Sequence, residues 1–288
     1  MDNIKITKKS FYIKNSHGDL MAADIRYPDT ESKLPLIIFC HGFKGFKDWG
    51  GFPYMADKLA AAGNFVLSFN FSYNGTGEKP EEQSEFTRLD LFAKNTFSRE
   101  QDDLQSVIDY AVNNKEGFGF DKNKIYLIGH SRGGGAVILK AGEDRRIKKL
   151  VTLASVNRFN RYNESMLKKW KEAGYIESLN TRTNQLMRMD YTLVEDLIAN
   201  PEKLDIQQAV SELKIPYLII HGMQDLSVDY SDAEDLYARS SKDLTELFLL
   251  EYTGHTFGIE HPFKGTTIAF DEVIKRIVDF LGDNNKSN

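Results

Sequence analysis

"IYLIGHSRGGG" (125–135) decides the fold of this chain. Its apolar half is typical of a buried strand, and a glycine-rich segment with helical character follows Ser131 at once. Gly129 and Gly133 flank the serine in the pattern G-x-S-x-G. On a tight turn between a strand and a helix, a serine exposes its hydroxyl at the edge of a sheet. The stretch therefore predicts a nucleophilic serine, and the alternative is a glycine-rich turn with an incidental serine.

Apolar runs and amphipathic stretches alternate along the rest of the chain. The apolar runs lie at 34–40, 64–71, 124–130, 148–155, 216–222 and 244–252, and the amphipathic stretches at 52–63, 99–114, 132–143 and 267–282. This alternation predicts an α/β fold with a mostly parallel central sheet and helices on both faces. Two alternating runs near the N-terminus, with a glycine-containing turn between them, predict an antiparallel hairpin at the sheet edge.

The connection over residues 156–206 is longer than one crossover helix requires. Ordered connections of this length are usually lids or extra subdomains. We therefore expect a single domain over residues 1–288 with an inserted helical cap at 156–206, whose helices occupy about 163–174 and 192–199. Residues 156–206 are called the cap below.

A serine hydroxyl is a weak nucleophile without a base and an acid that orients the base. His255 follows the last apolar run in a glycine-containing loop and is the favoured base, with His261 in reserve. Asp225 comes directly after the run at 216–222 and is the favoured acid. The later Asp229 and Asp232 are explained by the preference for acidic residues in the first turn of a helix.

A hydrolytic site also needs hydrogen-bond donors for the developing oxyanion. Glycines around "HGFKG" (41–45) allow the backbone to turn its amides inward, so the N–H of Phe43 is expected to be one donor. The N–H of Arg132, which follows the serine, is expected to be the other. The Lys44 side chain is expected to be solvated.

Four short motifs together resemble those of an α/β-hydrolase: "HGFKG" (41–45), "GHSRGG" (129–134), "HGMQD" (221–225) and "GHTF" (254–257). The order Ser131, Asp225, His255 fits that family. The similarity is greatest to the dienelactone-hydrolase and prolyl-oligopeptidase-like esterase branch, including feruloyl and cinnamoyl esterases. It implies ester hydrolysis through an acyl-enzyme, with no metal and no organic cofactor.

Two features depart from relatives in that branch. Dienelactone hydrolases proper use a cysteine nucleophile where this chain has Ser131, so lactone specificity is not carried over. Many relatives also have an acidic residue and an arginine in the loop after the strand that ends near 70, where this chain has "FNFSYNGTGEKP" (69–80).

The cap is expected to select the substrate, a short-acyl or small aromatic ester of the cinnamoyl type. Tyr162, Trp170 and Tyr175 are the predicted substrate-binding residues, and Phe159 and Tyr191 are further aromatic candidates. A substrate carboxylate or phosphate would meet one of four cap arginines, which are Arg158, Arg161, Arg182 and Arg188.

Composition excludes several other classes. A net charge of -5 gives no attraction to nucleic acid. We find no apolar stretch long enough for a signal peptide or a membrane span, so the expected location is cytoplasmic, with no membrane partner. Cys40 is expected to be a small buried residue.

A serine peptidase and a catalytically silent ligand receptor remain as alternatives, and the oligomeric state is open between monomer and homodimer.

Overall fold

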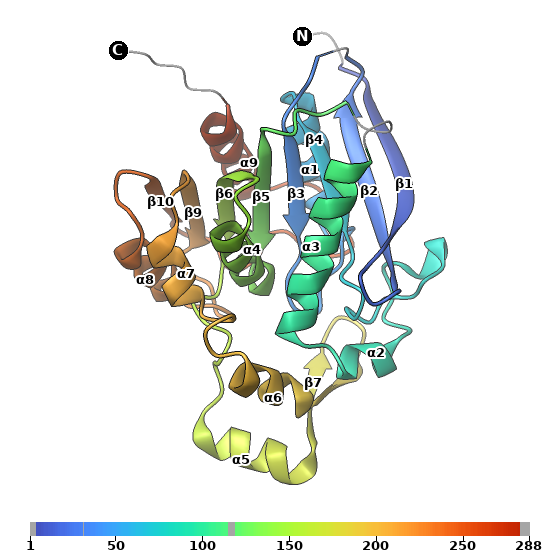
Figure 1. The fold of residues 1–288 in the computed structure, drawn as a ribbon, viewed down its shortest axis with the longest axis vertical. Coiled ribbons are helices and arrows are strands. Elements are labelled where there is room, and N and C mark those ends of the chain that lie inside the picture. The colour runs from blue at the N-terminus through green and yellow to red at the C-terminus, as the bar shows by residue number, and fades with distance from the viewer. Residues whose placement is uncertain (1–3, 31, 115–118, 283–288) are drawn as a thin grey trace.

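The computed structural model describes residues 4–30, 32–114 and 119–282 (Figure 1). Its main sheet has eight strands in the order β1-β2-β4-β3-β5-β6-β9-β10. They are β1 (Ile6–Lys14), β2 (Leu20–Pro28), β3 (Leu36–Cys40), β4 (Phe65–Phe69), β5 (Ile125–His130), β6 (Ile147–Leu153), β9 (Tyr217–Gly222) and β10 (Thr245–Leu250).

Six strands of this sheet are parallel to one another, namely β4, β3, β5, β6, β9 and β10. Strands β1 and β2 form an antiparallel hairpin, and β2 also pairs with β4 in antiparallel fashion. Every residue of β3, β4, β5 and β9 is buried, which explains why these strands have continuous apolar runs rather than alternating ones. The predicted fold class, with its N-terminal hairpin at the sheet edge, is confirmed.

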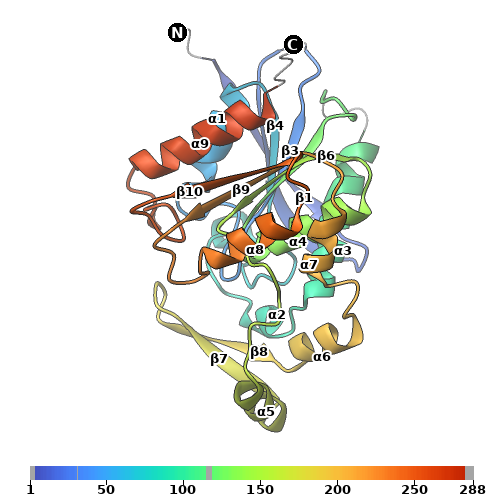
Figure 2. The same ribbon diagram turned by 90° about the vertical axis from the view of Figure 1, so that its left-hand side faces the viewer.

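Helices cover both faces of this sheet (Figure 2). On one face lie α1 (Phe52–Ala61) and α9 (Ile268–Leu281), which share a hydrophobic core with the strands. On the other lie α3 (Phe97–Asn113), α4 (Arg132–Glu143), α7 (Ile206–Glu212) and α8 (Ser231–Arg239) around a second, larger core. The short helices η1 (Pro80–Glu82) and α2 (Leu89–Ala93) follow β4. No helix among the described residues is long and apolar enough to cross a lipid bilayer.

The cap contains α5 (Glu164–Ala173), β7 (Tyr175–Asn180), β8 (Gln185–Asp190) and α6 (Thr192–Ala199). The two predicted helices are present, but the antiparallel hairpin β7-β8 between them corrects the expectation of a purely helical cap. Each strand has six residues, about half of them polar, so the alternation of apolar and polar residues gives only a weak indication of a strand. Gly174, in the left-handed conformation at φ 77°, ends α5 and lets the chain enter β7 directly. The cap lies beyond one end of the main sheet (Figures 1 and 2).

Candidate active site

The candidate nucleophile Ser131 occupies a strained turn between β5 and α4. Its backbone has φ 56° and ψ -120°, a conformation that costs a residue with a side chain about 1–3 kcal/mol. Hydrogen bonds hold the turn: the Ser131 N–H donates to the Leu153 carbonyl at 2.9 Å, and the Ser131 carbonyl accepts from the Gly134 N–H at 2.9 Å. The predicted strand, serine and helix arrangement is therefore present.

The glycines around Ser131 are required by close packing of the backbone. A Cβ atom on Gly129 would lie 2.6 Å from the carbonyl carbon of Gly133, and one on Gly133 would lie 2.6 Å from the carbonyl oxygen of Cys40. A Cβ on Gly134 would lie 2.5 Å from the Cβ of Ser155. The first turn of α4 thus rests directly on the segments that follow β3 and β6, which keeps the serine at the edge of the sheet.

Asp225 and His255 form a hydrogen-bonded pair at the same edge. The Nδ1–H of His255 donates to Oδ2 of Asp225 at 2.7 Å. The other carboxylate oxygen, Oδ1, accepts the backbone N–H groups of Ser227 at 2.8 Å and Val228 at 2.9 Å. This geometry leaves Nε2 of His255 free to accept a proton.

The Asp225 carboxylate stays ionised. Burial alone would raise its pKa, but hydrogen bonds from His221 and His255 hold the pKa of Asp225 well below its usual range. Nε2 of His221, a fully buried side chain that the sequence reasoning did not use, lies 3.2 Å from Oδ2 of Asp225. A carboxylate in this state can orient an imidazole and stabilise its protonated form.

Ser131 and His255 line one cavity of about 350 Å³. The loop that carries His255 is fixed by His130, whose Nε2–H donates to the His255 carbonyl at 2.9 Å. Burial lowers the pKa of His130 to about 3, so its ring is neutral at physiological pH. The residue before the candidate nucleophile therefore positions the loop of the candidate base.

Gly42 brings the loop after β3 onto the nucleophile. A Cβ atom at Gly42 would lie 2.9 Å from the Cβ of Ser131 and 3.0 Å from the His130 carbonyl oxygen. The next N–H along the chain is that of Phe43, and within the described chain neither it nor the N–H of Arg132 donates to a protein acceptor. Both amides are thus available as the oxyanion donors that the sequence predicts.

His41 holds the loop after β3 in place. Its Nδ1–H donates to the Gly42 carbonyl at 2.9 Å, and its Nε2 accepts the Phe71 N–H at 3.3 Å. Burial lowers the pKa of His41 to about 4. Only the neutral ring can donate on one side and accept on the other, so this pKa preserves the arrangement.

Substitution Gly42→Ala is expected to lower kcat/KM for an ester by about 10²-fold or more, because the added methyl group pushes the Phe43 amide away from Ser131. The measurement compares steady-state rates and thermal unfolding of the variant with those of Gly119→Ala. Gly119 has open space around its Cβ position, so that control should match the wild type. A Gly42→Ala enzyme with wild-type kcat/KM would contradict this role of the loop.

Lys44 connects the same loop to the cap. Its Nζ donates to the Ser178 Oγ at 2.7 Å and to the Leu179 carbonyl at 2.7 Å, both on β7. The sequence predicts a solvated side chain at Lys44, and this prediction is wrong. The acceptors lie more than 130 positions along the chain, so no local pattern could reveal them.

The Arg132 side chain is held by Glu100 of α3, which the sequence reasoning missed. Nε of Arg132 donates to Oε2 of Glu100 at 3.0 Å, and Nη2 lies 3.0 Å from Oε1. The guanidinium also lies over the Phe97 ring, 4.2 Å from its centroid. Glu100 belongs to the charged run "REQDD" (99–103), which looks like a solvated helix face. This buried ion pair anchors the first residue of α4.

The structure brings only some of the predicted cap residues to the cavity. Tyr162, Phe159, Arg158 and Arg161 line it. Trp170 does not: it is fully buried inside the cap and its indole N–H donates to the Met189 carbonyl at 3.0 Å.

Four further predicted cap residues also lie away from the cavity, namely Tyr175, Tyr191, Arg182 and Arg188. Tyr175 packs under the Arg188 guanidinium, which lies 4.2 Å from the ring centroid. The reserve base His261 accepts the Gly50 N–H at 2.9 Å and does not line the cavity with Ser131.

Ser131 also lines a smaller cavity of about 130 Å³. It shares Ser131, His255, Phe43 and Lys44 with the larger cavity, and its own walls include Trp49, Phe52, His130 and Thr256. The candidate nucleophile Ser131 therefore lines two cavities of unequal size.

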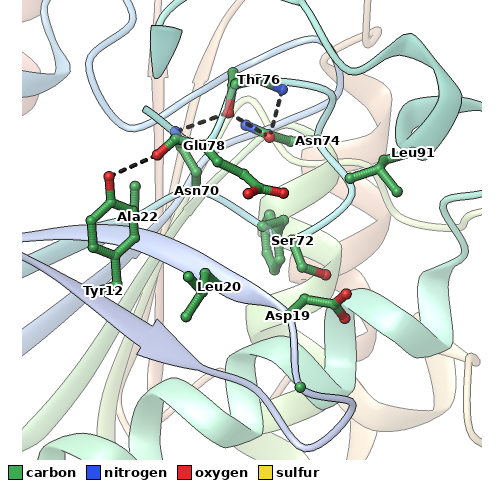
Figure 3. A pocket seen from close by; sticks show the side chains of 13 residues that line it. Tyr12, Asp19, Leu20, Ala22, Asn70, Ser72, Asn74, Thr76, Glu78 and Leu91 are labelled. Carbon is green, nitrogen blue, oxygen red and sulfur yellow. Dashed lines mark hydrogen bonds between the residues drawn. The ribbon is translucent and has the colours of Figure 1, made fainter. Parts of the chain in front are cut away.

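A third cavity, of about 280 Å³, lies between the β1-β2 hairpin and residues 70–78 (Figure 3). Its polar groups bond to one another: the Tyr12 hydroxyl donates to the Glu78 carbonyl at 2.7 Å, and Nδ2 of Asn70 donates to the Thr76 Oγ1 at 3.2 Å. The same segment supports the loop after β3, because the Asn70 Oδ1 accepts the Lys47 N–H at 2.7 Å. We therefore assign residues 70–78 a structural role in support of the loop after β3.

No cluster of three or more His, Cys, Asp or Glu side chains suited to a metal ion occurs in the described parts of the chain.

Comparisons with known proteins agree with this architecture. The model of the alpha/beta hydrolase fold family matches residues 35–186. An uncharacterised 31.7 kDa protein from the traX-finO intergenic region of Escherichia coli is 27% identical over an alignment of 209 residues, which covers 69% of this chain and 68% of that protein.

Solved structures share the fold. Est1E from Butyrivibrio proteoclasticus with bound ferulic acid superposes with a TM-score of 0.69 at 21% identity, over 94% of this chain and 97% of that one. The esterase domain of a Rhodothermus marinus protein gives a TM-score of 0.64 at 19% identity, over 96% of this chain and 100% of that one. The resemblance inferred from the four sequence motifs is confirmed at the level of the family.

Proposed function

This chain belongs to the alpha/beta hydrolase fold family, and from that premise we propose that it is a serine hydrolase that cleaves carboxylic esters through an acyl-enzyme. The observation that carries the proposal is the pairing of Asp225 with His255 at 2.7 Å beside a cavity that His255 shares with Ser131. Ser131 itself sits on the strained turn at the end of β5.

In the proposed reaction, Oγ of Ser131 attacks the ester carbonyl carbon while Nε2 of His255 takes the hydroxyl proton. Asp225 holds the Nδ1–H and stabilises the imidazolium that forms. The amides of Phe43 and Arg132 donate to the oxyanion of the tetrahedral intermediate, which is worth about 2.7–4 kcal/mol per donor. The intermediate collapses when His255 protonates the leaving alcohol, and water then deacylates Ser131 with the same histidine as base.

The proposed substrate is a short-acyl or small aromatic ester. The larger cavity has an aromatic wall in which Phe97 and Phe159 stack with ring centroids 4.1 Å apart, and Tyr162 completes this wall. The structural relative Est1E carries ferulic acid, a small aromatic acid. Cavities of about 350 and 130 Å³ suit a compact ester better than a polypeptide, so no observation favours the peptidase alternative.

Covalent labelling tests the proposal. A fluorophosphonate reacts only with an activated serine, so the folded protein should be labelled within minutes and peptide mapping should place the label on Ser131. Heat-denatured protein is the control and should not react. Absence of label from the folded protein would contradict the proposal and favour a ligand receptor that retains the fold.

A further inference from the structure

The larger cavity is lined by more positive charge than ester hydrolysis requires. Lys44, Arg132, Arg158 and Arg161 all line it, and its wall contains no Asp or Glu. An ester group is neutral, and the oxyanion that forms during attack is served by the backbone amides. The surplus cations therefore call for another explanation.

Two of the four cations are neutralised by the protein itself. The Arg132 guanidinium pairs with Glu100, as described above. Arg161 pairs with Asp232 of α8, which also accepts the Asn157 N–H at 3.1 Å. These ion pairs hold α4 and the start of the cap, and each arginine charge is balanced by a carboxylate of the protein.

Lys44 and Arg158 are different, because neither has a carboxylate partner among the residues that the structure describes. The two acceptors of Lys44 on β7 are uncharged. Burial lowers the pKa of Lys44. Arg158 is exposed and lines only the larger of the two cavities that meet at Ser131. A negative charge entering this cavity would find two unpaired cations.

Apart from Ser131, Ser227, His255 and the Tyr162 hydroxyl, the remaining wall is apolar. Besides Phe97 and Phe159, it includes Val156 and Val228, both of which are buried. A group that fits such a wall has an aromatic or short aliphatic body, and its charge must reach the cationic positions. Of the four cations, Lys44 also lines the smaller cavity, whereas Arg132, Arg158 and Arg161 line only the larger one.

We propose that the half of the ester that enters the larger cavity carries a carboxylate, which Arg158 and Lys44 bind. Arginine and carboxylate form charge-assisted, commonly bidentate hydrogen bonds. The substrate class is thus a monoester of a dicarboxylic acid, or an ester of a hydroxy acid, with a small neutral group in the second cavity. This inference rests on the proposed ester hydrolysis, since it assigns a substrate to the same site.

Two matched substrate pairs test the inference and cover both placements of the charge. The 4-nitrophenyl monoester of glutaric acid is compared with its methyl-capped diester, and 4-acetoxybenzoate is compared with methyl 4-acetoxybenzoate. Each kcat/KM is divided by the second-order rate constant for hydrolysis by hydroxide, because the charged and neutral members differ in intrinsic reactivity toward an external nucleophile. We expect the carboxylate member to be preferred by about tenfold or more in at least one pair. Absence of a preference for the carboxylate member in both pairs would overturn the inference.

Arg158 variants then locate the preference. Arg158→Gln should reduce the ratio of charged to neutral kcat/KM by about tenfold, and Arg158→Lys should retain part of it. The matched control is Arg188→Gln, a cap arginine that pairs with Asp190 at 2.6 Å, lies outside the cavity and should leave the ratio unchanged. A ratio that Arg158→Gln does not change would also overturn the inference.

Failure of this inference and failure of the proposed function give different results. If Ser131→Ala hydrolyses both pairs as fast as the wild type, or if the wild type hydrolyses neither, ester hydrolysis at Ser131 is refuted and the inference falls with it. If hydrolysis depends on Ser131 but shows no preference for the carboxylate, only the inference is refuted.

Discussion

Replacement of Ser131 by alanine is expected to lower kcat for a short-chain 4-nitrophenyl ester by on the order of 10⁵ to 10⁶-fold. The variant has no oxygen to form the acyl-enzyme, and what remains is the small rate enhancement from the oxyanion donors and substrate binding. Alanine keeps a Cβ atom at φ 56°, so the backbone strain of the turn is unchanged and the fold should persist. Steady-state kinetics and circular dichroism at matched concentrations measure both effects.

Ser211→Ala is the matched control, since it removes a hydroxyl from the surface of α7, where that group donates to the Gln208 carbonyl at 2.7 Å. It should retain wild-type activity. Residual activity of Ser131→Ala within tenfold of the wild type, in protein free of host esterase, would refute the assignment of the nucleophile.

Asp225→Asn is expected to lower kcat by about 10⁴-fold with little change in fold. An asparagine can turn an N–H toward Nδ1 of His255, which would place the ring proton on Nε2 and direct a donor rather than an acceptor at Ser131. It also removes the negative charge that stabilises the imidazolium. The hydrogen bonds from Ser227 and Val228 can still be accepted by the amide oxygen, so the loop keeps its shape.

The control for this variant is Asp229→Asn. Asp229 accepts the Ser231 N–H at the start of α8 and does not contact His255, so its variant should be within a few-fold of the wild type. Because the pKa of Asp225 is held low, its own protonation should not limit activity in the weakly acidic range, and the two Asp variants can be compared at one pH. Asp225→Asn with a tenth or more of wild-type activity would show that another group orients His255.

Local patterns in the sequence were sufficient for the sheet and for the loops around Ser131. Strands buried on both faces produce continuous apolar runs, and glycines mark the places where backbones approach closely, as Gly42 and Gly133 do. Because these strands are parallel, their carboxyl ends place Phe43, Ser131, Asp225 and His255 at one edge of the sheet. This placement can be predicted without side-chain positions. The periodicity of apolar residues and the positions of glycines therefore predict the sheet and the loops that carry the candidate site residues.

The supporting contacts could not be predicted in this way, because each joins segments that are distant in the chain. In the sequence, Glu100 is one of several charged residues on an amphipathic helix. Its partner Arg132 is known only from the packing of α3 against α4. Trp170 was expected to face the substrate, yet it forms the centre of the cap between Tyr162 and Tyr191. An aromatic side chain on a helix has the same pattern whether its face covers a ligand or a neighbouring strand.

The bridge from Lys44 to β7 has a consequence for chimeric enzymes. Because Lys44 follows Phe43 directly and its ammonium group is held by Ser178 and Leu179, the loop after β3 is tied to the cap, a distant part of the chain. Grafting the cap of a relative onto this body would exchange the cap side chains that line the larger cavity and, at the same time, remove an anchor of the loop beside Ser131. The two segments therefore have to be transplanted together if a change of specificity is to leave the chemistry intact.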